Sequence, residues 1–187
     1  EIPLRLVGSE MCKETVLGVI LSGIGIVILI LTASYRLDRI TSYLNPWSDP
    51  LGTGFQSIQS LYAISPAGLF GHGLFKSHQK FYFLPEPQTD FIFAIIVEEL
   101  GLIGGLIVIA SFSILIVIGY YGAMKCEDIF SKNILFGFTT LIFVQAFINM
   151  GVVTGLLPVT GVTLPFLSYG GSSLITTMAM MELILTY

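Results

Sequence analysis

The densest group of chemically useful side chains lies between Lys76 and Asp90, directly before a long apolar run. The stretch also contains Lys80, the carboxylate of Glu86 and the hydroxyl of Thr89. A carboxylate such as Asp90 can act as a general base toward a sugar hydroxyl, and a lysine can bind phosphate as a point charge. The pattern therefore suggests a polar site where a hydroxyl group and a phosphate meet.

Each of these side chains also has a plainer interpretation. Prolines just upstream prevent a helix before Phe91, so Thr89 or Asp90 can cap the helix that follows. Lys76 and Lys80 can lie in solvent or among lipid headgroups. The residue types alone do not decide between these interpretations.

Two further carboxylates, Glu98 and Glu99, interrupt the apolar run itself. On a helix, Glu98 lies about 80° around the axis from Asp90 and about 12 Å deeper, whereas Glu99 points to the opposite side. Charges within a membrane segment are costly, so each is a functional-site hypothesis. The alternative is that each carboxylate pairs with a basic residue of another helix.

The composition predicts that lipid is the solvent of this chain. Hydrophobic residues make up 54% and charged residues 11% of it, with a mean hydropathy of +0.88, whereas soluble domains carry about 25% charged residues. The net charge is −4 and the basic residues are scattered, which gives no sign of a nucleic-acid surface. Two distant cysteines, Cys12 and Cys126, form no metal or redox motif, so we expect free thiols.

Four apolar stretches are long enough, or nearly so, to cross a bilayer as helices. We therefore expect an all-α integral membrane protein with a single membrane domain over residues 1–187. The expected transmembrane helices cover about 15–34, 91–120, 134–153 and 172–187.

The connections between these stretches predict the orientation. Segment 121–133 is short and carries two lysines, so the positive-inside rule places it in the cytoplasm. Segments 35–90 and 154–171 then lie outside the cell. Within 35–90, apolar residues recur at helical spacing from Phe55 to Ile64, which predicts a short helix in the membrane interface.

Segment 154–171 is too apolar for an ordinary exposed loop, although Pro158 and Pro165 prevent a regular helix. Each large apolar side chain is worth about 1.5–3 kcal/mol when buried. We therefore expect a re-entrant-like segment that folds back beside Asp90, where hydroxyls such as that of Ser168 satisfy part of its backbone.

Two other motifs have structural explanations. Gly68–Gly73 superficially resembles a phosphate-binding loop, but no strand precedes it, so we expect its glycines to serve turns or close approach. Gln145 and Asn149 are four residues apart and share one face of a helix. For them we expect hydrogen bonds to another helix.

Several long motifs resemble those of the SEDS (shape, elongation, division and sporulation) family of FtsW, RodA and SpoVE proteins. The resemblance covers essentially all 187 residues, and the sporulation and division members look nearest. It implies a ten-helix membrane fold, of which this chain would supply helices seven to ten, without the first six. The matching stretches are Gln79–Lys80, Leu84–Glu86, Thr89–Phe93, Glu98–Gly101 and Asn149–Ser173.

This resemblance implies an enzyme of the bacterial plasma membrane that polymerises lipid II into peptidoglycan strands and releases undecaprenyl pyrophosphate. Such enzymes serve division, elongation or sporulation, and work with a class B penicillin-binding protein among the membrane lipids. Asp90 matches the catalytic residue, proposed to activate the acceptor's 4-hydroxyl. A divalent cation, Mg²⁺ or Mn²⁺, is the candidate cofactor, with Asp90 as its candidate ligand.

We accordingly expect Asp90 to be catalytic, and a further set of residues to bind substrate: Lys80, Gln79, Glu86, Thr89, Glu98 and Ser168. Two sequence departures from the family stand out, since some division members have Glu in place of Tyr82, and relatives tend to have a small residue in place of Glu182. We expect this chain alone not to complete an active site.

Two alternative functions stay open on the sequence. Polar residues within a helical bundle also suit a lipid II flippase, and a non-catalytic scaffold for the penicillin-binding protein would need no catalytic carboxylate. Catalysis concentrates its residues at the outer face, whereas transport needs polar residues at both faces.

Overall fold

The computed structural model describes residues 16–25, 39, 41–52, 54–77, 79 and 88–186. These residues form helices and turns without any strand, which confirms the all-α class for the described part of the chain. The chain divides into two units, Glu1–Thr41 and Ser42–Tyr187. In the first unit, Val16–Gly25 is an apolar helix with almost all of its side chains exposed. The rest of the expected helix 15–34 lies outside the described residues.

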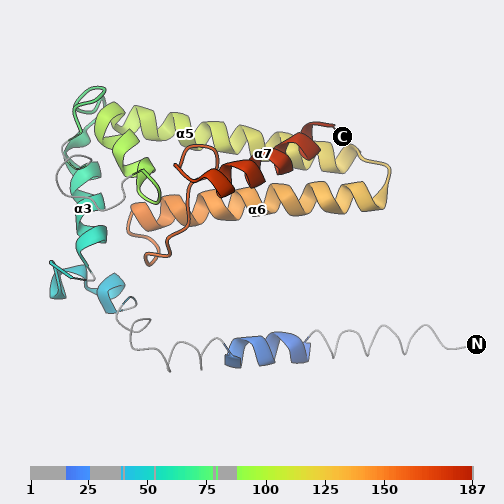
Figure 1. The fold of residues 1–187 in the computed structure, drawn as a ribbon, viewed down its shortest axis with the longest axis horizontal. Helices are drawn as coiled ribbons and strands as arrows, with labels where there is room; N and C mark the ends of the chain where they lie inside the picture. Colours follow the sequence, from blue (N-terminus) through green and yellow to red (C-terminus); the bar gives the residue numbers. More distant parts are fainter. Residues whose placement is uncertain are drawn as a thin grey trace, which may run out of the picture. The chain divides into compact units, whose positions relative to one another are not determined.

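Two long antiparallel helices form the centre of the second unit (Figure 1). Helix α5 covers Ile92–Lys125 and α6 covers Ile129–Val153, and both are long and apolar enough to cross a membrane. Both extend beyond the expected ranges into the polar segment 121–133, where Lys125 ends α5 and Lys132 lies in the first turn of α6, and lysine is a good helix former. Asp128 also caps α6 by accepting a hydrogen bond from the Ser131 N–H at 2.9 Å.

The sequence suggested one continuous helix here, but α5 breaks at Gly101. This glycine has φ 72° and ψ −166°, a conformation that residues with a Cβ rarely adopt. In an unbroken helix the N–H groups of Leu102 and Ile103 would donate to the carbonyls of Glu98 and Glu99. The break frees these four groups inside an apolar helix, and buried backbone groups without partners are costly.

The glycine-rich turn Gly68–Gly73 supplies partners for all four groups. The N–H groups of Leu102 and Ile103 donate to the carbonyls of Gly68 and Leu69 at 3.0 and 3.3 Å. In the other direction, the N–H groups of His72 and Gly73 donate to the carbonyls of Glu98 and Glu99, each at 3.0 Å. The motif Gly68–Gly73 therefore serves close backbone approach, as expected, and its N–H groups at 72 and 73 are committed to α5.

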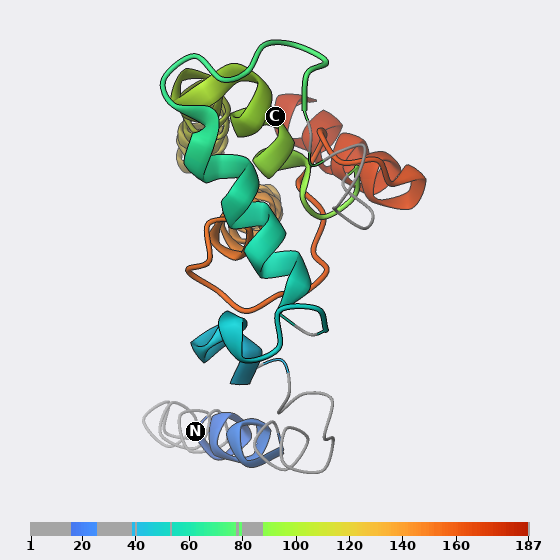
Figure 2. The same cartoon turned by 90° about the vertical axis from the view of Figure 1, so that its left-hand side faces the viewer.

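Helix α3 covers Phe55–Ile64, and two 3-10 turns flank it, η1 (Pro46–Ser48) and η2 (Ser65–Ala67). Figures 1 and 2 show α3 lying across one end of the α5–α6 pair. It buries Ile58 and Ala63 against that end. A helix is therefore present where the apolar spacing in segment 35–90 predicted one.

The carboxyl end of α6 is closed by a Schellman motif. The Leu156 N–H donates to the Gly151 carbonyl at 2.8 Å, and the Gly155 N–H donates to the Val152 carbonyl at 3.0 Å. Gly155 has φ 76°, the left-handed conformation that this motif requires. The chain then reverses beside the end of α6 instead of continuing as a helix.

Helix α7 covers Gly171–Thr186 and packs along α6 (Figure 1). Its buried side chains, Thr177, Met180 and Ile184, recur at three- and four-residue spacing, so they share one face. The helix agrees with the expected stretch 172–187, and its 16 residues are fewer than the about 20 needed for a straight span.

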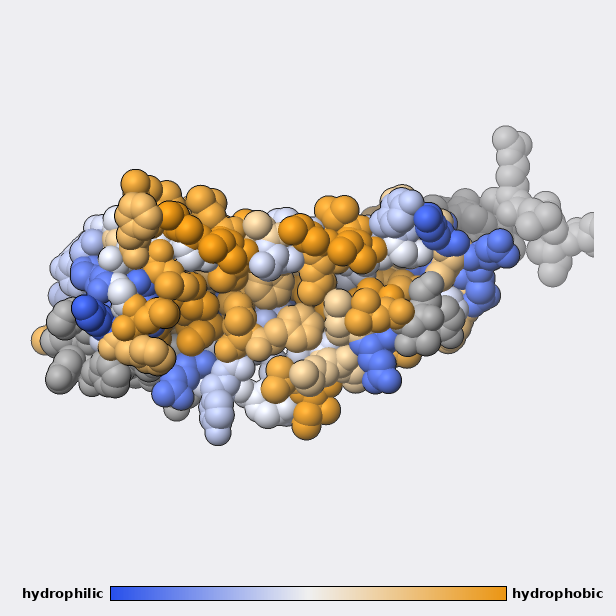
Figure 3. All heavy atoms as spheres, turned by 90° about the horizontal axis from the view of Figure 1, so that it is seen from above, coloured by the Kyte–Doolittle hydropathy of each residue, from blue (hydrophilic) through white to orange (hydrophobic). Residues whose placement is uncertain are grey.

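Close packing of α5 on α6 depends on a small residue. A Cβ at Gly119 would lie 2.5 Å from Thr139 Oγ1, so the missing side chain is what allows the helices to approach. The outward face of α5 is apolar along its middle, with hydrophilic residues at both ends (Figure 3). Its exposed large apolar residues include Leu106, Ile107, Ile114, Val117 and Ile118.

Candidate functional site

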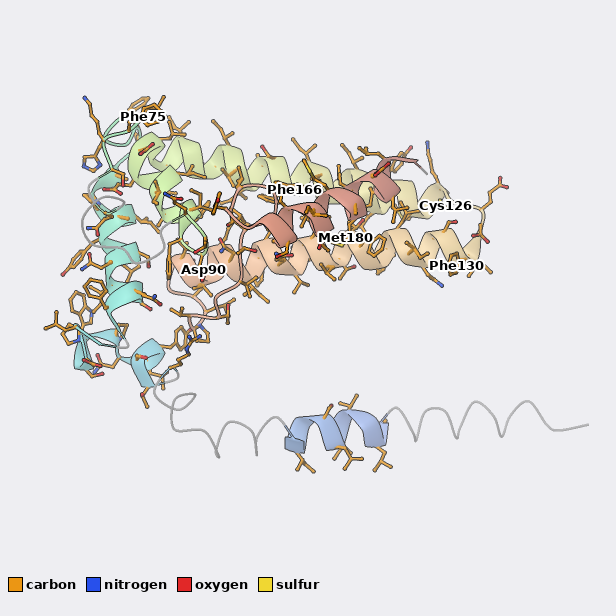
Figure 4. The ribbon with its side chains drawn as sticks, in the orientation of Figure 1. Phe75, Asp90, Cys126, Phe130, Phe166 and Met180 are labelled. Carbon is orange, nitrogen blue, oxygen red and sulfur yellow. The ribbon has the colours of Figure 1, made fainter. Side chains whose placement is uncertain are left out.

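Asp90 lies at the end of the α5–α6 pair that is opposite Cys126 and Phe130 (Figure 4). Its side chain is half-buried, and the following Phe91 is only 2% exposed. Phe91, not Thr89 or Asp90, occupies the N-cap position of α5. The expected cap is therefore shifted by one residue, because the buried ring of Phe91 anchors the start of the helix.

The backbone of Asp90 is bound to α6 through Asn149. The Nδ2 of Asn149 donates to the Asp90 carbonyl at 2.8 Å and to the Val162 carbonyl at 2.7 Å. Asn149 is 1% exposed. The expectation of a hydrogen bond to another helix was wrong, since the partners are backbone carbonyls of the segments that precede α5 and follow α6.

Gly161 faces the carboxylate of Asp90. A Cβ at position 161 would lie 3.5 Å from Asp90 Oδ2, and the glycine has φ 73°. Gln145 lies on α6 one turn before Asn149, and its Nε2 donates to the Thr163 carbonyl at 3.1 Å. The segment after α6 thus forms one wall beside the carboxylate, and its backbone is held at two consecutive positions, Val162 and Thr163.

Two further hydrogen bonds complete this wall. The Leu164 N–H donates to Ser168 Oγ at 2.7 Å, and the Tyr169 N–H donates to the Gln88 carbonyl at 2.9 Å. Ser168, which we expected to bind substrate, is 9% exposed and has this contact within its own segment. The second bond joins the chain just before Asp90 to the chain just before α7.

Segment 154–171 therefore lies beside Asp90, where its apolar composition had placed it. Leu164 is 1% exposed, and the side chain of Asn149 and the hydroxyl of Ser168 satisfy part of its backbone. Leu156 and Leu167 remain 70% and 44% exposed in this chain. The segment is thus packed against the site on one side only.

A second polar cluster surrounds Glu98, which is 3% exposed. The hydroxyl of Ser77 donates to Glu98 Oε2 at 2.5 Å, and the Gln79 N–H donates to Glu98 Oε1 at 3.3 Å. Two of the expected binding residues, Gln79 and Glu98, are therefore brought together. Ser77 was not expected, since a serine in a polar stretch does not indicate a site by itself.

Glu99 is also buried, at 9% exposed, and its Oε1 has no hydrogen-bond partner among the described residues. Glu98 differs from Glu99, because hydrogen bonds from the Ser77 hydroxyl and the Gln79 N–H reach its carboxylate and fasten these two residues to α5.

Four residues singled out in the sequence lie outside the described residues, namely Lys80, Glu86, Tyr82 and Cys12. Thr89 is described, and it is half-buried next to Asp90. Within the described ranges, no three His, Cys, Asp or Glu side chains gather as metal ligands. A single carboxylate fits Mg²⁺ that is held mostly by water and substrate phosphates, but not a cage of protein ligands.

The chain matches proteins of bacterial cell-wall synthesis. The family model described as "Cell cycle protein" for FtsW, RodA and SpoVE matches residues 4–187. Stage V sporulation protein E of Bacillus subtilis (strain 168) is 58% identical over 168 residues, which are 89% of this chain and 45% of that protein. A probable peptidoglycan glycosyltransferase FtsW of Geobacter metallireducens is 52% identical over 150 residues, which are 80% of this chain and 40% of that protein.

The fold has a solved counterpart. A chain from a peptidoglycan synthase complex, studied for its coordination of polymerization and crosslinking, superimposes with a TM-score of 0.66 at 32% identity. The match covers 92% of this chain and 48% of that chain, so the present chain spans less than half of each of these relatives. These similarities confirm the resemblance suggested by the motifs, and the chain belongs to the FtsW/RodA/SpoVE family of cell cycle proteins.

Proposed function

We propose that this chain is part of a membrane glycosyltransferase that polymerises lipid II into peptidoglycan strands and releases undecaprenyl pyrophosphate. The observation that carries the proposal is the position of Asp90. Its half-buried carboxylate stands against Gly161, and Asn149 holds the backbone both at Asp90 and at Val162. The relatives named as peptidoglycan glycosyltransferases support the same reaction.

In this proposal Asp90 is the general base. Its carboxylate accepts the proton of the acceptor's 4-hydroxyl while that oxygen bonds to the anomeric carbon of the donor sugar, and the bond from that carbon to the pyrophosphate breaks. Gly161 itself places no side chain against this carboxylate. Five residues are proposed to bind the sugars or the pyrophosphate: Lys80, Gln79, Glu86, Thr89 and Ser168. The carboxylate of Glu98 holds Gln79 in place by accepting a hydrogen bond from its backbone N–H.

A divalent cation belongs to the proposal as an addition. Asp90 would be its protein ligand, and Mg²⁺ or Mn²⁺ would offset the negative charge of the pyrophosphate. The base function of Asp90 does not require this cation, since proton transfer needs only a carboxylate within reach of the hydroxyl.

The proposed topology is a multi-pass protein of the bacterial plasma membrane, in which this chain supplies four spans. Described residues of segments 42–90 and 154–170 meet at one end of the α5–α6 pair. The connection at 126–128, flanked by Lys125 and Lys132, lies at the other end (Figure 1). The positive-inside rule then places the Asp90 end outside the cell. A class B penicillin-binding protein is the proposed partner, in line with the synthase complex that the fold resembles.

The test is Asp90→Asn in the full-length protein, purified and supplied with lipid II. We expect glycan strand formation to fall by at least about 100-fold, a typical contribution of a general base, with normal expression and thermal stability. Retained strand formation would rule out Asp90 as the base. Transfer of labelled lipid II across vesicle membranes without any polymer would instead favour a flippase, and unchanged wall synthesis with the partner bound would favour a scaffold.

A further inference from the structure

Asn149 joins the two chain segments that face each other at Asp90. Its Nδ2 donates to the carbonyls of Asp90 and Val162 at 2.8 and 2.7 Å. Both partners are carbonyl oxygens, which can only accept, so the amide must present its nitrogen to them. We propose that Asn149 is a positioning residue for Asp90, which sets the carboxylate against the segment after α6. The proposal rests on the catalytic role proposed above for Asp90.

The burial of the amide indicates why an asparagine occupies this position. Asn149 is 1% exposed, and its Oδ1 has no hydrogen-bond partner among the residues that the structure describes. A buried acceptor without a partner has a free-energy cost, because it has lost its hydrogen bonds to water. An apolar side chain of similar size would fill the space without that cost. The amide is therefore explained by its two donor hydrogens and not by packing.

The two hydrogen bonds act directly next to the carboxylate. One binds the backbone of Asp90 itself, and the other binds Val162, the neighbour of Gly161. A Cβ at Gly161 would lie 3.5 Å from Asp90 Oδ2. Asn149 is thus bonded both to Asp90 and to the segment that faces its carboxylate. A displacement of about 1 Å at a reacting group can lower the rate about 100-fold.

Gln145 provides a comparison on the same face of α6. Its Nε2 donates to the carbonyl of Thr163 at 3.1 Å, so it holds the segment after α6. Both of its hydrogen bonds among the described residues go to Thr163, to the carbonyl and to Oγ1 at 3.4 Å, so Gln145 does not hold Asp90. A variant at Gln145 therefore tests support of the segment alone, whereas a variant at Asn149 tests the connection between both walls.

The experiment measures polymerisation of purified lipid II by the full-length protein at several lipid II concentrations. For Asn149→Ala we expect kcat to fall by about 10- to 100-fold, with KM within about 2-fold, because the residue positions the base without binding substrate. Gln145→Ala should lose less than about 5-fold, since Asp90 stays bound to α6. Thr140→Ala is the remote control, because its hydroxyl bonds Tyr120 at 3.0 Å far from the site.

Asn149→Asp is the second variant, for the case that Asn149→Ala does not fold. It keeps the volume of the side chain and replaces the donor nitrogen by an oxygen, so we expect a similar loss of kcat. A kcat within about 2-fold of the unsubstituted protein, in whichever variant folds, would overturn the proposal. So would a loss for Asn149→Ala no greater than that for Gln145→Ala.

Asp90→Asn, measured in parallel, separates this proposal from the assignment of the base. Full activity of Asp90→Asn would overturn both, because no base would then need positioning. Loss of activity in Asp90→Asn together with full activity in Asn149→Ala would overturn the positioning role alone and leave the base assignment intact.

Discussion

Gly71 and Gly101 lie with their backbones in contact, so close that a Cβ on either glycine would overlap the backbone nitrogen of the other. Both have left-handed φ values, 70° and 72°. The contact is the centre of the junction at which the turn after α3 accepts and donates the hydrogen bonds that α5 loses at its break. The bend of α5 and the position of the turn therefore depend on each other.

Gly101→Ala should destabilise the protein strongly. A Cβ in the left-handed conformation costs about 1–2 kcal/mol, and overlap with the Leu69 carbonyl adds to that cost. Thermal unfolding of the full-length protein in detergent measures the effect as a lower Tm. The matched control is Gly137→Ala, since a Cβ at Gly137 in α6 meets nothing within 4 Å.

In a helix interior, alanine is favoured over glycine by about 0.5–1 kcal/mol. Gly137→Ala should therefore leave Tm unchanged or raise it slightly. Equal shifts for the two variants would show that the break at Gly101 does not require a glycine.

Ser77 and Glu98 should show coupled effects on stability. Ser77→Ala removes a donor from a carboxylate that is 3% exposed, and a buried charged group that loses a partner costs about 1–3 kcal/mol or more. In a double-mutant cycle with Glu98→Ala, we expect a coupling energy of about 0.5–3 kcal/mol. Thermal unfolding and protease cleavage within 68–79 are the two measurements.

The control for this cycle is Ser113→Ala on the exposed surface of α5, where the hydroxyl bonds only the carbonyl one turn earlier at 2.8 Å. Its effect should stay within about 0.5 kcal/mol. Strictly additive effects of Ser77→Ala and Glu98→Ala would contradict the view that Glu98 fastens this stretch to α5.

Asp128 should give α6 a stability that depends on pH. The N–H of Ser131, and then its hydroxyl, hold the pKa of Asp128 below its ordinary value. A lowered pKa means that the contribution is complete above the unfolded pKa of about 3.9 and is lost as pH falls through the lower folded value. Asp128→Asn keeps an acceptor oxygen for Ser131 but does not titrate.

The measurement is Tm as a function of pH for the unsubstituted protein and for Asp128→Asn. The difference between them should be constant from about pH 5 to 8 and should change only below about pH 4. A difference that stays the same down to about pH 3 would show that the Asp128 carboxylate does not contribute through its charge.

Local pattern was sufficient for most of the helices. Apolar runs predicted α5, α6 and α7, and apolar spacing predicted the helix from Phe55 to Ile64. Such helices are predictable because their apolar residues recur at short, regular distances along the sequence. Their ends were less predictable. Helix α6 begins at Ile129, earlier than expected, because Asp128 caps it, and α5 continues past its expected end to Lys125.

The break of α5 could not be read from the same pattern. Glycine occurs at four positions between Gly101 and Gly119, and only Gly101 among them has a positive φ. What selects it is the turn at Gly68–Gly73, which supplies partners for the freed backbone groups. That turn lies far away in the sequence, so only the tertiary structure brings the two together.

The sequence by itself determined that this is an apolar, helical chain of a known family, with Asp90 at the start of a long helix. It also showed that Gln145 and Asn149 share a face of α6. Only the tertiary structure decided what they bind, because their partners are backbone carbonyls, at Thr163 for one and at Asp90 and Val162 for the other. Every residue has a carbonyl group, so no residue type marks such a partner, and its identity follows from how the chain folds.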